Sequence, residues 1–248
     1  MDKGYKKGTI TSNIEIASNI YELKVASSFN SPFYGEAGQF YMLRAWNGLD
    51  PFLARPLSIS NIMDGEITFL YQLRGRGTER ISKLKSGDSL ELMGPLGSSF
   101  NTNLRGNVAL ISGGIGIAPL VFLAKSLKAN IDFYCGFKDE VYYIDKIRKY
   151  SRAVYISTES GSVGYRGLIT EIFNPALYDI AFSCGPVGMM KRIVKMCKGK
   201  IPVYISMENR MACGIGACLG CSIKTSKGMK RVCKEGAVFL GEEVFYCD

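Results

Sequence analysis

The chain of 248 residues contains no histidine and only one tryptophan. Histidine is the one side chain whose ordinary pKa lies near neutral pH, and it is the commonest metal ligand. Its absence excludes base catalysis by imidazole, zinc sites with imidazole ligands and Rieske-type iron–sulfur ligation. We expect no catalytic acid–base residue, and any metal site must use other ligands.

The sequence also lacks the features of a secreted protein. Its first ten residues, MDKGYKKGTI, form no apolar segment of the kind that a signal peptide needs. Eight cysteines are too few for a small disulfide scaffold, and half of them lie in one cluster. These observations predict a protein of the reducing cytoplasm.

A long uncharged stretch, residues 106–124, raises the alternative of a membrane helix. It contains Gly113, Gly114, Gly116 and Pro119, which favour a buried strand, a turn and a helix instead. The net charge of +9 is spread along the chain, and its densest basic run, residues 189–200, has helical spacing. We interpret that run as the solvated face of a helix, and expect neither nucleic acid nor a membrane as partner.

The first hundred residues predict an antiparallel β-barrel. Short segments alternate apolar and polar side chains, as in residues 21–27, where Tyr21, Leu23 and Val25 alternate with Glu22 and Lys24. Gly- and Pro-containing breaks separate these segments. Regular short strands of this kind are typical of a barrel.

The pattern changes from residue 107 onward. Apolar runs of strand length alternate with candidate helices, and a last strand ends near residue 205; the helices are expected at 117–128, 142–150, 167–173 and 186–197. Strands that alternate with helices predict a parallel sheet covered on both faces. The Gly- and Cys-rich residues 207–248 are too few for a core of their own. We therefore predict a β plus α/β fold in three parts: a barrel domain at 1–102, an α/β domain at 103–206 and a small module at 207–248.

Four cysteines of the last part have a diagnostic spacing. Cys213, Cys218, Cys221 and Cys233 follow the pattern C-x4-C-x2-C-x11-C. Zinc ribbons usually have two C-x2-C pairs, whereas C-x4-C-x2-C with a distant fourth cysteine is the plant-type [2Fe–2S] spacing. The glycines between them, Gly214, Gly216 and Gly220, allow positive φ angles and bare backbone near a cluster. Structural zinc and disulfides remain alternatives.

Two segments of the barrel have features suited to a diphosphate. Arg55, in the sequence ARPLSIS, can hold a phosphate bidentately, and Ser58 can direct its hydroxyl at a ring edge. A glycine turn at Gly75 and Gly77 leads into a helix that opens at Thr78, where free amides favour anions. Each segment alone is also compatible with an ordinary surface arginine or turn.

The α/β part contains two glycine turns at predicted strand ends. LISGGIGIAPL places Gly113, Gly114 and Gly116 between a strand and a helix, and SCGPVGMM places Cys184, Gly185 and Pro186 likewise. Turns at the carboxyl ends of parallel strands face one crevice, where a dinucleotide can bind. Tight turns without a ligand are the alternative, and Cys184 is equally compatible with simple packing.

The order of these motifs, R-P-x-S, G-x-G-T, G-G-x-G-x-A-P and C-G-P, resembles the ferredoxin–NADP reductase superfamily. With MENRMACGIGACLGC and RVCKEGAVF, the whole chain resembles the family of electron-transfer subunits of type B dihydroorotate dehydrogenase, in pyrimidine biosynthesis. The resemblance implies an FAD-binding barrel, an NAD-binding α/β domain and a [2Fe–2S] module. It implies that FAD contacts Arg55, Pro56, Leu57, Ser58, Leu70, Tyr71, Gln72, Gly77 and Thr78, and that Cys213, Cys218, Cys221 and Cys233 are the cluster ligands.

The resemblance also implies a partner and a direction of electron flow. The partner is an FMN-containing catalytic subunit, in a heterotetramer of two subunits of each kind, and NAD is the final acceptor. Leu57 replaces an aromatic residue seen in many plant-type reductases, so flavin stacking is expected of Tyr71. The short gap before Cys233 is interpreted as a trimmed hairpin. Two alternatives remain: a related flavin and iron–sulfur subunit of a sulfhydrogenase or transhydrogenase, and a non-catalytic, zinc-stabilised interaction module.

Overall fold

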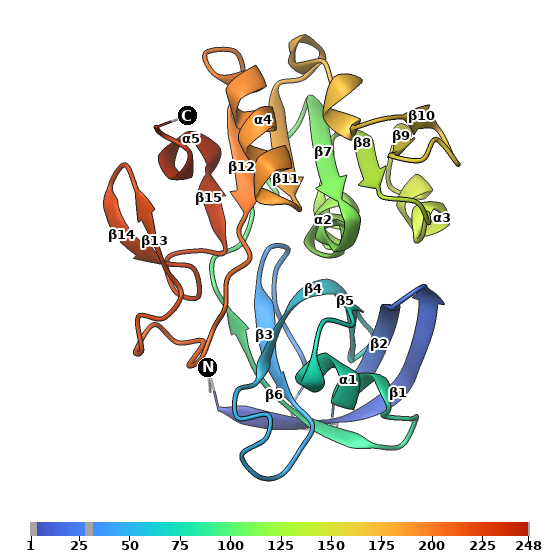
Figure 1. Ribbon diagram of the computed structural model, residues 1–248, viewed down its shortest axis with the longest axis vertical. Helices are drawn as coiled ribbons and strands as arrows, with labels where there is room; N and C mark the ends of the chain where they lie inside the picture. Colours follow the sequence, from blue (N-terminus) through green and yellow to red (C-terminus); the bar gives the residue numbers. More distant parts are fainter. Residues whose placement is uncertain (1–3, 28–31, 248) are drawn as a thin grey trace.

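The computed structural model describes residues 4–27 and 32–247. Figure 1 shows the barrel at the bottom, the α/β part above it and the C-terminal module along one side of both. The predicted β plus α/β fold with an appended module is confirmed. The first three residues of the predicted N-terminal segment lie outside the described part of the chain.

Six antiparallel strands close into the barrel in the order β1-β2-β5-β4-β3-β6. Their alternation places Leu23, Val25, Ile67 and Phe69 inside with no exposed surface. A short helix, α1 (Arg76–Ser82), follows β5. The strands are β1 (Tyr5–Ala17), β2 (Ile20–Ser27), β3 (Phe40–Arg44), β4 (Arg55–Met63), β5 (Glu66–Gln72) and β6 (Ser89–Leu96).

Seven strands form the second sheet, in the order β10-β9-β8-β7-β11-β12-β15. Separate apolar clusters cover its two faces: one contains α2 and the other α4. The strands are β7 (Asn107–Gly113), β8 (Asn130–Phe137), β9 (Ala153–Thr158), β10 (Tyr165–Arg166), β11 (Ile180–Cys184), β12 (Val203–Ser206) and β15 (Val238–Leu240). The helices are α2 (Ile117–Ser126), α3 (Ile144–Arg148) and α4 (Val187–Cys197), with 3-10 turns η1 (Gly114–Gly116), η2 (Ile169–Glu171) and η3 (Pro175–Leu177).

Two sequence expectations for this sheet were wrong. The segment 167–173 forms no α-helix and contains only the turn η2, since Gly167 has a φ of 135° and Asn174 precedes a proline, which disfavours helical backbone. The strand ending near 205 does not close the sheet either. β15, from the C-terminal module, pairs antiparallel with β12.

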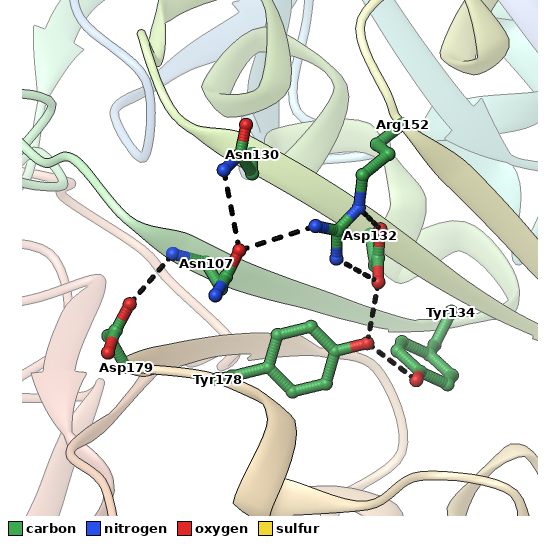
Figure 2. A network of polar contacts seen from close by, with 7 residues as sticks. All are labelled: Asn107, Asn130, Asp132, Tyr134, Arg152, Tyr178 and Asp179. Atoms are coloured by element: carbon green, nitrogen blue, oxygen red, sulfur yellow. Dashed lines mark hydrogen bonds and ion pairs between the residues drawn. The ribbon is translucent and has the colours of Figure 1, made fainter.

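A polar network ties the sheet together at the amino ends of its strands (Figure 2). Buried Asp132 on β8 accepts two hydrogen bonds from Arg152, at 2.9 and 2.8 Å, and one from the hydroxyl of Tyr178 at 2.9 Å. Burial acts to raise the pKa of Asp132, but the bonds from Arg152 and Tyr178 hold it below its ordinary value. Because the network lies opposite the carboxyl ends, it stabilises the sheet and leaves the crevice to the glycine turns.

The C-terminal module has no separate core. It consists of the hairpin β13 (Ser222–Thr225) and β14 (Gly228–Arg231), then β15 and α5 (Gly241–Val244). Its buried Met211, Cys221 and Val232 share one apolar cluster with Met42 of the barrel and Ile205 of the sheet. The hairpin expected before Cys233 is confirmed. Among the described helices, none has the length and apolarity to cross a membrane.

Candidate functional site

The two barrel segments expected to bind a diphosphate meet in space. Arg55, at the start of β4, lies over the indole ring of Trp46, with 5.6 Å from Cζ to the ring centroid. A Cβ atom at Gly77 would lie 2.3 Å from the Arg55 Nε, so only glycine admits the guanidinium there. Burial lowers the pKa of Arg55, although it remains charged. The guanidinium of Arg55 therefore lies directly against the backbone of the glycine turn at Gly77.

A cavity of about 210 Å³ opens beside this pair. Its wall includes eight of the nine residues expected to contact FAD, all except Gly77: Arg55, Pro56, Leu57, Ser58, Leu70, Tyr71, Gln72 and Thr78. Gly77 instead supports Arg55 from behind. A concave site with apolar walls and a few polar groups is the usual form of a cofactor pocket.

Two side chains of this cavity also make contacts within the barrel that the sequence did not predict. Tyr71 is only 1% exposed: its ring stacks on Tyr21 at 5.3 Å, and its hydroxyl donates to Asn13 at 3.1 Å. The ring of Tyr71 therefore packs in the barrel core, and the flavin stacking expected of it stays a prediction. The Thr78 hydroxyl accepts hydrogen bonds from the amides of Arg74 and Gly75, so it shapes the turn.

The two glycine turns of the α/β part pack directly on each other. A Cβ at Gly116 would lie 2.2 Å from the carbonyl oxygen of Cys184, and one at Gly185 would lie 2.8 Å from the amide nitrogen of Gly113. Strands β7 and β11, which carry these turns, are parallel neighbours. Glycine is required at these positions because backbone meets backbone.

These turns line a second, larger cleft of about 1190 Å³ between the barrel and the α/β domain. The predicted residues Gly113, Gly114, Gly116, Gly185 and Pro186 are in its wall. Cys184 is not, because its thiol is buried in the core; burial raises its pKa well above the ordinary value.

Four residues line both the cavity and the cleft: Gln72, Arg74, Ile115 and Glu208. Arg74 and Glu208 were not predicted from the sequence. Glu208 is exposed in the open cleft, yet the protein around it desolvates the carboxylate and raises its pKa, which Arg74 partly offsets. A perturbed carboxylate where two cavities join is typical of a functional site. Its position two residues after the end of β12 was the only available signal.

The four predicted cluster cysteines lie in one region beside the barrel, but among the described residues no group of three or more ligand side chains is arranged to hold a metal ion. The amide of Cys218 donates to the sulfur of Cys213 at 3.4 Å, that of Gly220 to Cys218 at 3.5 Å, and that of Cys233 to Cys221 at 3.4 Å. Gly214 and Gly216 have positive φ angles, as expected, but Gly220 does not, and Leu219 (φ 59°) takes that role.

The thiols of this loop fit a thiolate-ligated cluster. Desolvation acts to raise the pKa of Cys213, yet the amides of Cys218, Ile215 and Ala217 bring it down to about 6. Burial raises the pKa of Cys233 to about 12, and the neighbouring Cys221 adds to the effect. Amides directed at the sulfurs favour thiolates, which are the ligands that an iron–sulfur cluster needs.

Arg231 fixes the cluster loop to the strand that leads to Cys233. It donates to the carbonyl oxygen of Gly216 at 2.9 Å and forms an ion pair with Glu235. On the other side, a Cβ at Gly214 would lie 2.8 Å from Cγ of Met42, so the loop also rests on the barrel. The loop is therefore held between the hairpin and β3.

A flavin-type barrel, a nucleotide cleft and a four-cysteine loop in one chain define a flavin- and nicotinamide-dependent reductase with an iron–sulfur centre. The comparisons with known proteins agree. Residues 208–245 match the family model described as the iron–sulfur cluster binding domain of dihydroorotate dehydrogenase B. A solved structure of an NADH-dependent reduced ferredoxin-NADP oxidoreductase superposes with a TM-score of 0.86 at 27% identity, covering 96% of this chain and 89% of the other.

Two curated relatives extend over essentially the whole chain. The dihydroorotate dehydrogenase B (NAD(+)) electron transfer subunit of Clostridium acetobutylicum is 49% identical over 251 residues, covering 100% of both chains. That of Clostridium perfringens is 47% identical over 247 residues, covering 97% of this chain and 98% of its own. The chain belongs to the family of dihydroorotate dehydrogenase B electron transfer subunits, as the sequence motifs predicted.

Proposed function

We propose that this chain passes electrons from the FMN of a dihydroorotate dehydrogenase catalytic subunit to NAD, in pyrimidine biosynthesis. The cofactors are FAD, a [2Fe–2S] cluster and NAD as substrate. When bound, the flavin supplies the exchange of a hydride with NAD and of single electrons with the iron–sulfur centre. The protein supplies positions for these groups.

The observation that carries this proposal is the order of the three sites. The flavin-type cavity shares Gln72, Arg74, Ile115 and Glu208 with the nucleotide cleft. On its other side, Met211 and Ala237 of the C-terminal module line the same cavity. The cavity therefore lies between the nucleotide cleft and the cysteine loop, which is the order that electron flow requires.

The proposed assignments follow from the contacts. Arg55 and Ser58 orient FAD, and Gly77 allows Arg55 to approach. Gly113, Gly114, Gly116, Gly185 and Pro186 admit the NAD backbone to the cleft, while Cys184 supports them from the core. Cys213, Cys218, Cys221 and Cys233 ligate the cluster. Glu208 and Arg74, a pair of opposite charge, border the space between flavin and nicotinamide.

We propose the domain limits 1–102, 103–206 and 207–248, with FAD, NAD and the cluster assigned in that order. The C-terminal module shares its core with both other parts, which supports a dependent unit rather than a free domain. Thiolate ligands without disulfides also support a cytoplasmic compartment. A heterotetramer with two copies of each subunit is part of the proposal.

An anaerobic NADH titration of the purified chain tests the redox assignment. We expect bleaching of the flavin absorbance and a rhombic electron paramagnetic resonance signal from the cluster. A colourless protein that binds zinc and does not react with NADH would refute the proposal. Co-purification with a dihydroorotate-oxidising subunit, with the mass of a two-plus-two complex, tests the partner; capture of a transhydrogenase subunit instead would favour the alternative.

A further inference from the structure

The tip of the β1–β2 hairpin belongs to the barrel but forms part of the nucleotide cleft. Residues 17–20 line one side of the cleft, and residues 138–140 with Tyr142 line it from the α/β domain. In Figure 1 this tip is on the side of the barrel that faces α3. Ala17 and Ile20 share an apolar cluster with Phe137 and Tyr142. The hairpin is thus packed onto the other domain.

A hydrogen bond at the rim of the cleft reinforces this packing. The amide of Ser18 donates to Oε2 of Glu140 at 2.8 Å. The next residue, Asn19, has a φ of 60°, and its amide donates to Glu15 at 2.7 Å, which fixes the turn. A carboxylate of the α/β domain therefore holds a rigid turn of the barrel.

Below the rim, Glu22 is a buried carboxylate on the outer face of β2. Strand alternation predicts that this face meets solvent, yet the Glu22 side chain is only 4% exposed because the α/β domain covers it. Nζ of Lys146 on α3 lies 2.5 Å from its Oε2, whereas Lys24 of the barrel is 4.0 Å from its Oε1. A buried carboxylate is costly unless it is paired, so Glu22 depends on the other domain.

Tyr143 completes this contact from an unusual backbone conformation. Its φ of 66° and ψ of 5° lie in the left-handed region, which few bulky residues adopt. The Lys146 ammonium lies 4.6 Å from its ring centroid. Burial raises the pKa of the Tyr143 phenol, and the negative charge of the nearby Glu22 raises it further. Non-glycine residues held in sparsely populated backbone regions cluster at functional sites.

We propose that Glu22, Tyr143 and Lys146 form an interdomain latch that fixes the nicotinamide-binding domain on the flavin barrel, with the Ser18–Glu140 bond as its part at the rim. This inference rests on the proposed function. Glu22 and Lys146 do not line the cleft, so they are positioning residues. NAD lies between two bodies whose orientation sets its approach to the flavin, and a misplacement of 1 Å can lower a rate about a hundredfold.

Lys146→Met tests the latch, because it removes the charge and keeps the aliphatic stem. In the loaded complex with its catalytic subunit, we expect the limiting rate of flavin reduction at saturating NADH to fall about fivefold. The NADH concentration at half-maximal rate should change less than about twofold, since no cleft residue is altered. Lys146→Arg should restore the rate. Lys83→Met is the matched control, because it breaks an exposed ion pair with Glu79 on α1.

Amide hydrogen exchange gives a second readout that does not depend on activity. Exchange of the peptide 17–20 should accelerate about tenfold or more in Lys146→Met and in Glu140→Ala, but not in Lys83→Met. Glu140→Ala removes the acceptor of the Ser18 amide and leaves no buried charge, so it keeps the test valid if Lys146→Met folds poorly. A Lys146→Met protein with normal hydrogen exchange and a normal limiting rate of flavin reduction would overturn the latch. A change confined to the NADH concentration at half-maximal rate would also overturn it, as would a Lys146→Arg protein as slow as Lys146→Met. Wild-type protein that fails to react with NADH would instead overturn the proposed function.

Discussion

Gly116 is the point where the two nucleotide turns touch, and Gly116→Ala is the sharpest test of that geometry. The new methyl carbon would lie 2.2 Å from the carbonyl oxygen of Cys184 and 2.6 Å from the amide nitrogen of Gly185. Favourable contacts begin near roughly 3.5 Å, so the turns must separate by about 1 Å. The φ of Gly116 is −59°, which alanine adopts freely, so the effect is purely steric.

The cost follows from which atoms collide. Both are backbone atoms at the end of β11, which is hydrogen-bonded to β7, so no side-chain rotation can relieve the contact. Overpacking of this kind costs about 1–3 kcal/mol. We expect the free energy of unfolding, measured by denaturant titration, to fall by about 2–3 kcal/mol. Because these turns line the cleft, the NADH concentration at half-maximal flavin reduction should rise about tenfold.

Gly114→Ala provides a matched control in the same turn. Gly114 has a φ of 52°, and a Cβ there would meet no heavy atom within 4 Å. Alanine should cost about 1–2 kcal/mol through left-handed strain, but the two turns would stay in contact. Its loss of unfolding free energy should therefore be the smaller of the two. A Gly116→Ala protein with normal stability and NADH dependence, or a Gly114→Ala protein with the greater loss of unfolding free energy, would refute the reasoning.

Three further predictions concern the flavin cavity, the cluster and the sheet. Gly77→Ala should displace the Arg55 guanidinium and lower the FAD content of purified protein; full FAD occupancy would contradict the role of that contact. Cys221→Ser should abolish iron binding, whereas Cys247→Ser, outside the cluster spacing, should leave it normal; equal iron contents would contradict the ligand assignment. Asp132 stabilises the sheet above its unfolded pKa of about 4, and this contribution is lost as pH falls through its lower folded pKa. On acidification below about pH 4, the free energy of unfolding should therefore fall further in the wild type than in Asp132→Asn. An equal fall in both proteins would exclude a contribution from the carboxylate.

The fold was largely predictable because its signals are local. The change from alternating residues to long apolar runs near residue 107 marks the passage from barrel to parallel sheet, as the structure shows. The sequence predictions were wrong where tertiary contacts determine the secondary structure. β15 has only three residues, which are too few to show an alternating pattern in the sequence. It forms because the edge of β12 is open for pairing. The segment 167–173 contains apolar residues at helical spacing, but the chain around Gly167 and Pro175 admits only one turn.

The residues of the candidate site likewise fall into those that sequence motifs predicted and those that only the structure revealed. Cysteine spacing and glycine turns are sequence motifs, so their residues could be named in advance. Arg74 and Glu208 carry no motif and become candidates only when the cavity and the cleft are seen to share them. Glu22 alternates with apolar residues like any solvent-facing strand residue, and only the packing of α3 buries it. The contact of Tyr71 with Tyr21 and Asn13 was not predictable either, because an alternating pattern does not show which side chains meet across strands.

The absence of a separate core in the C-terminal module has a consequence for electron transfer. A one-electron centre must keep a fixed distance from the flavin, and a freely moving domain could not provide it. Here β15 is hydrogen-bonded into the large sheet, while Gly214 rests on Met42 of the barrel. The same module lines the flavin cavity through Met211 and Ala237. These contacts fix the module to both the sheet and the barrel, and the shared core makes the separation between the cysteine loop and the flavin cavity a property of the fold itself.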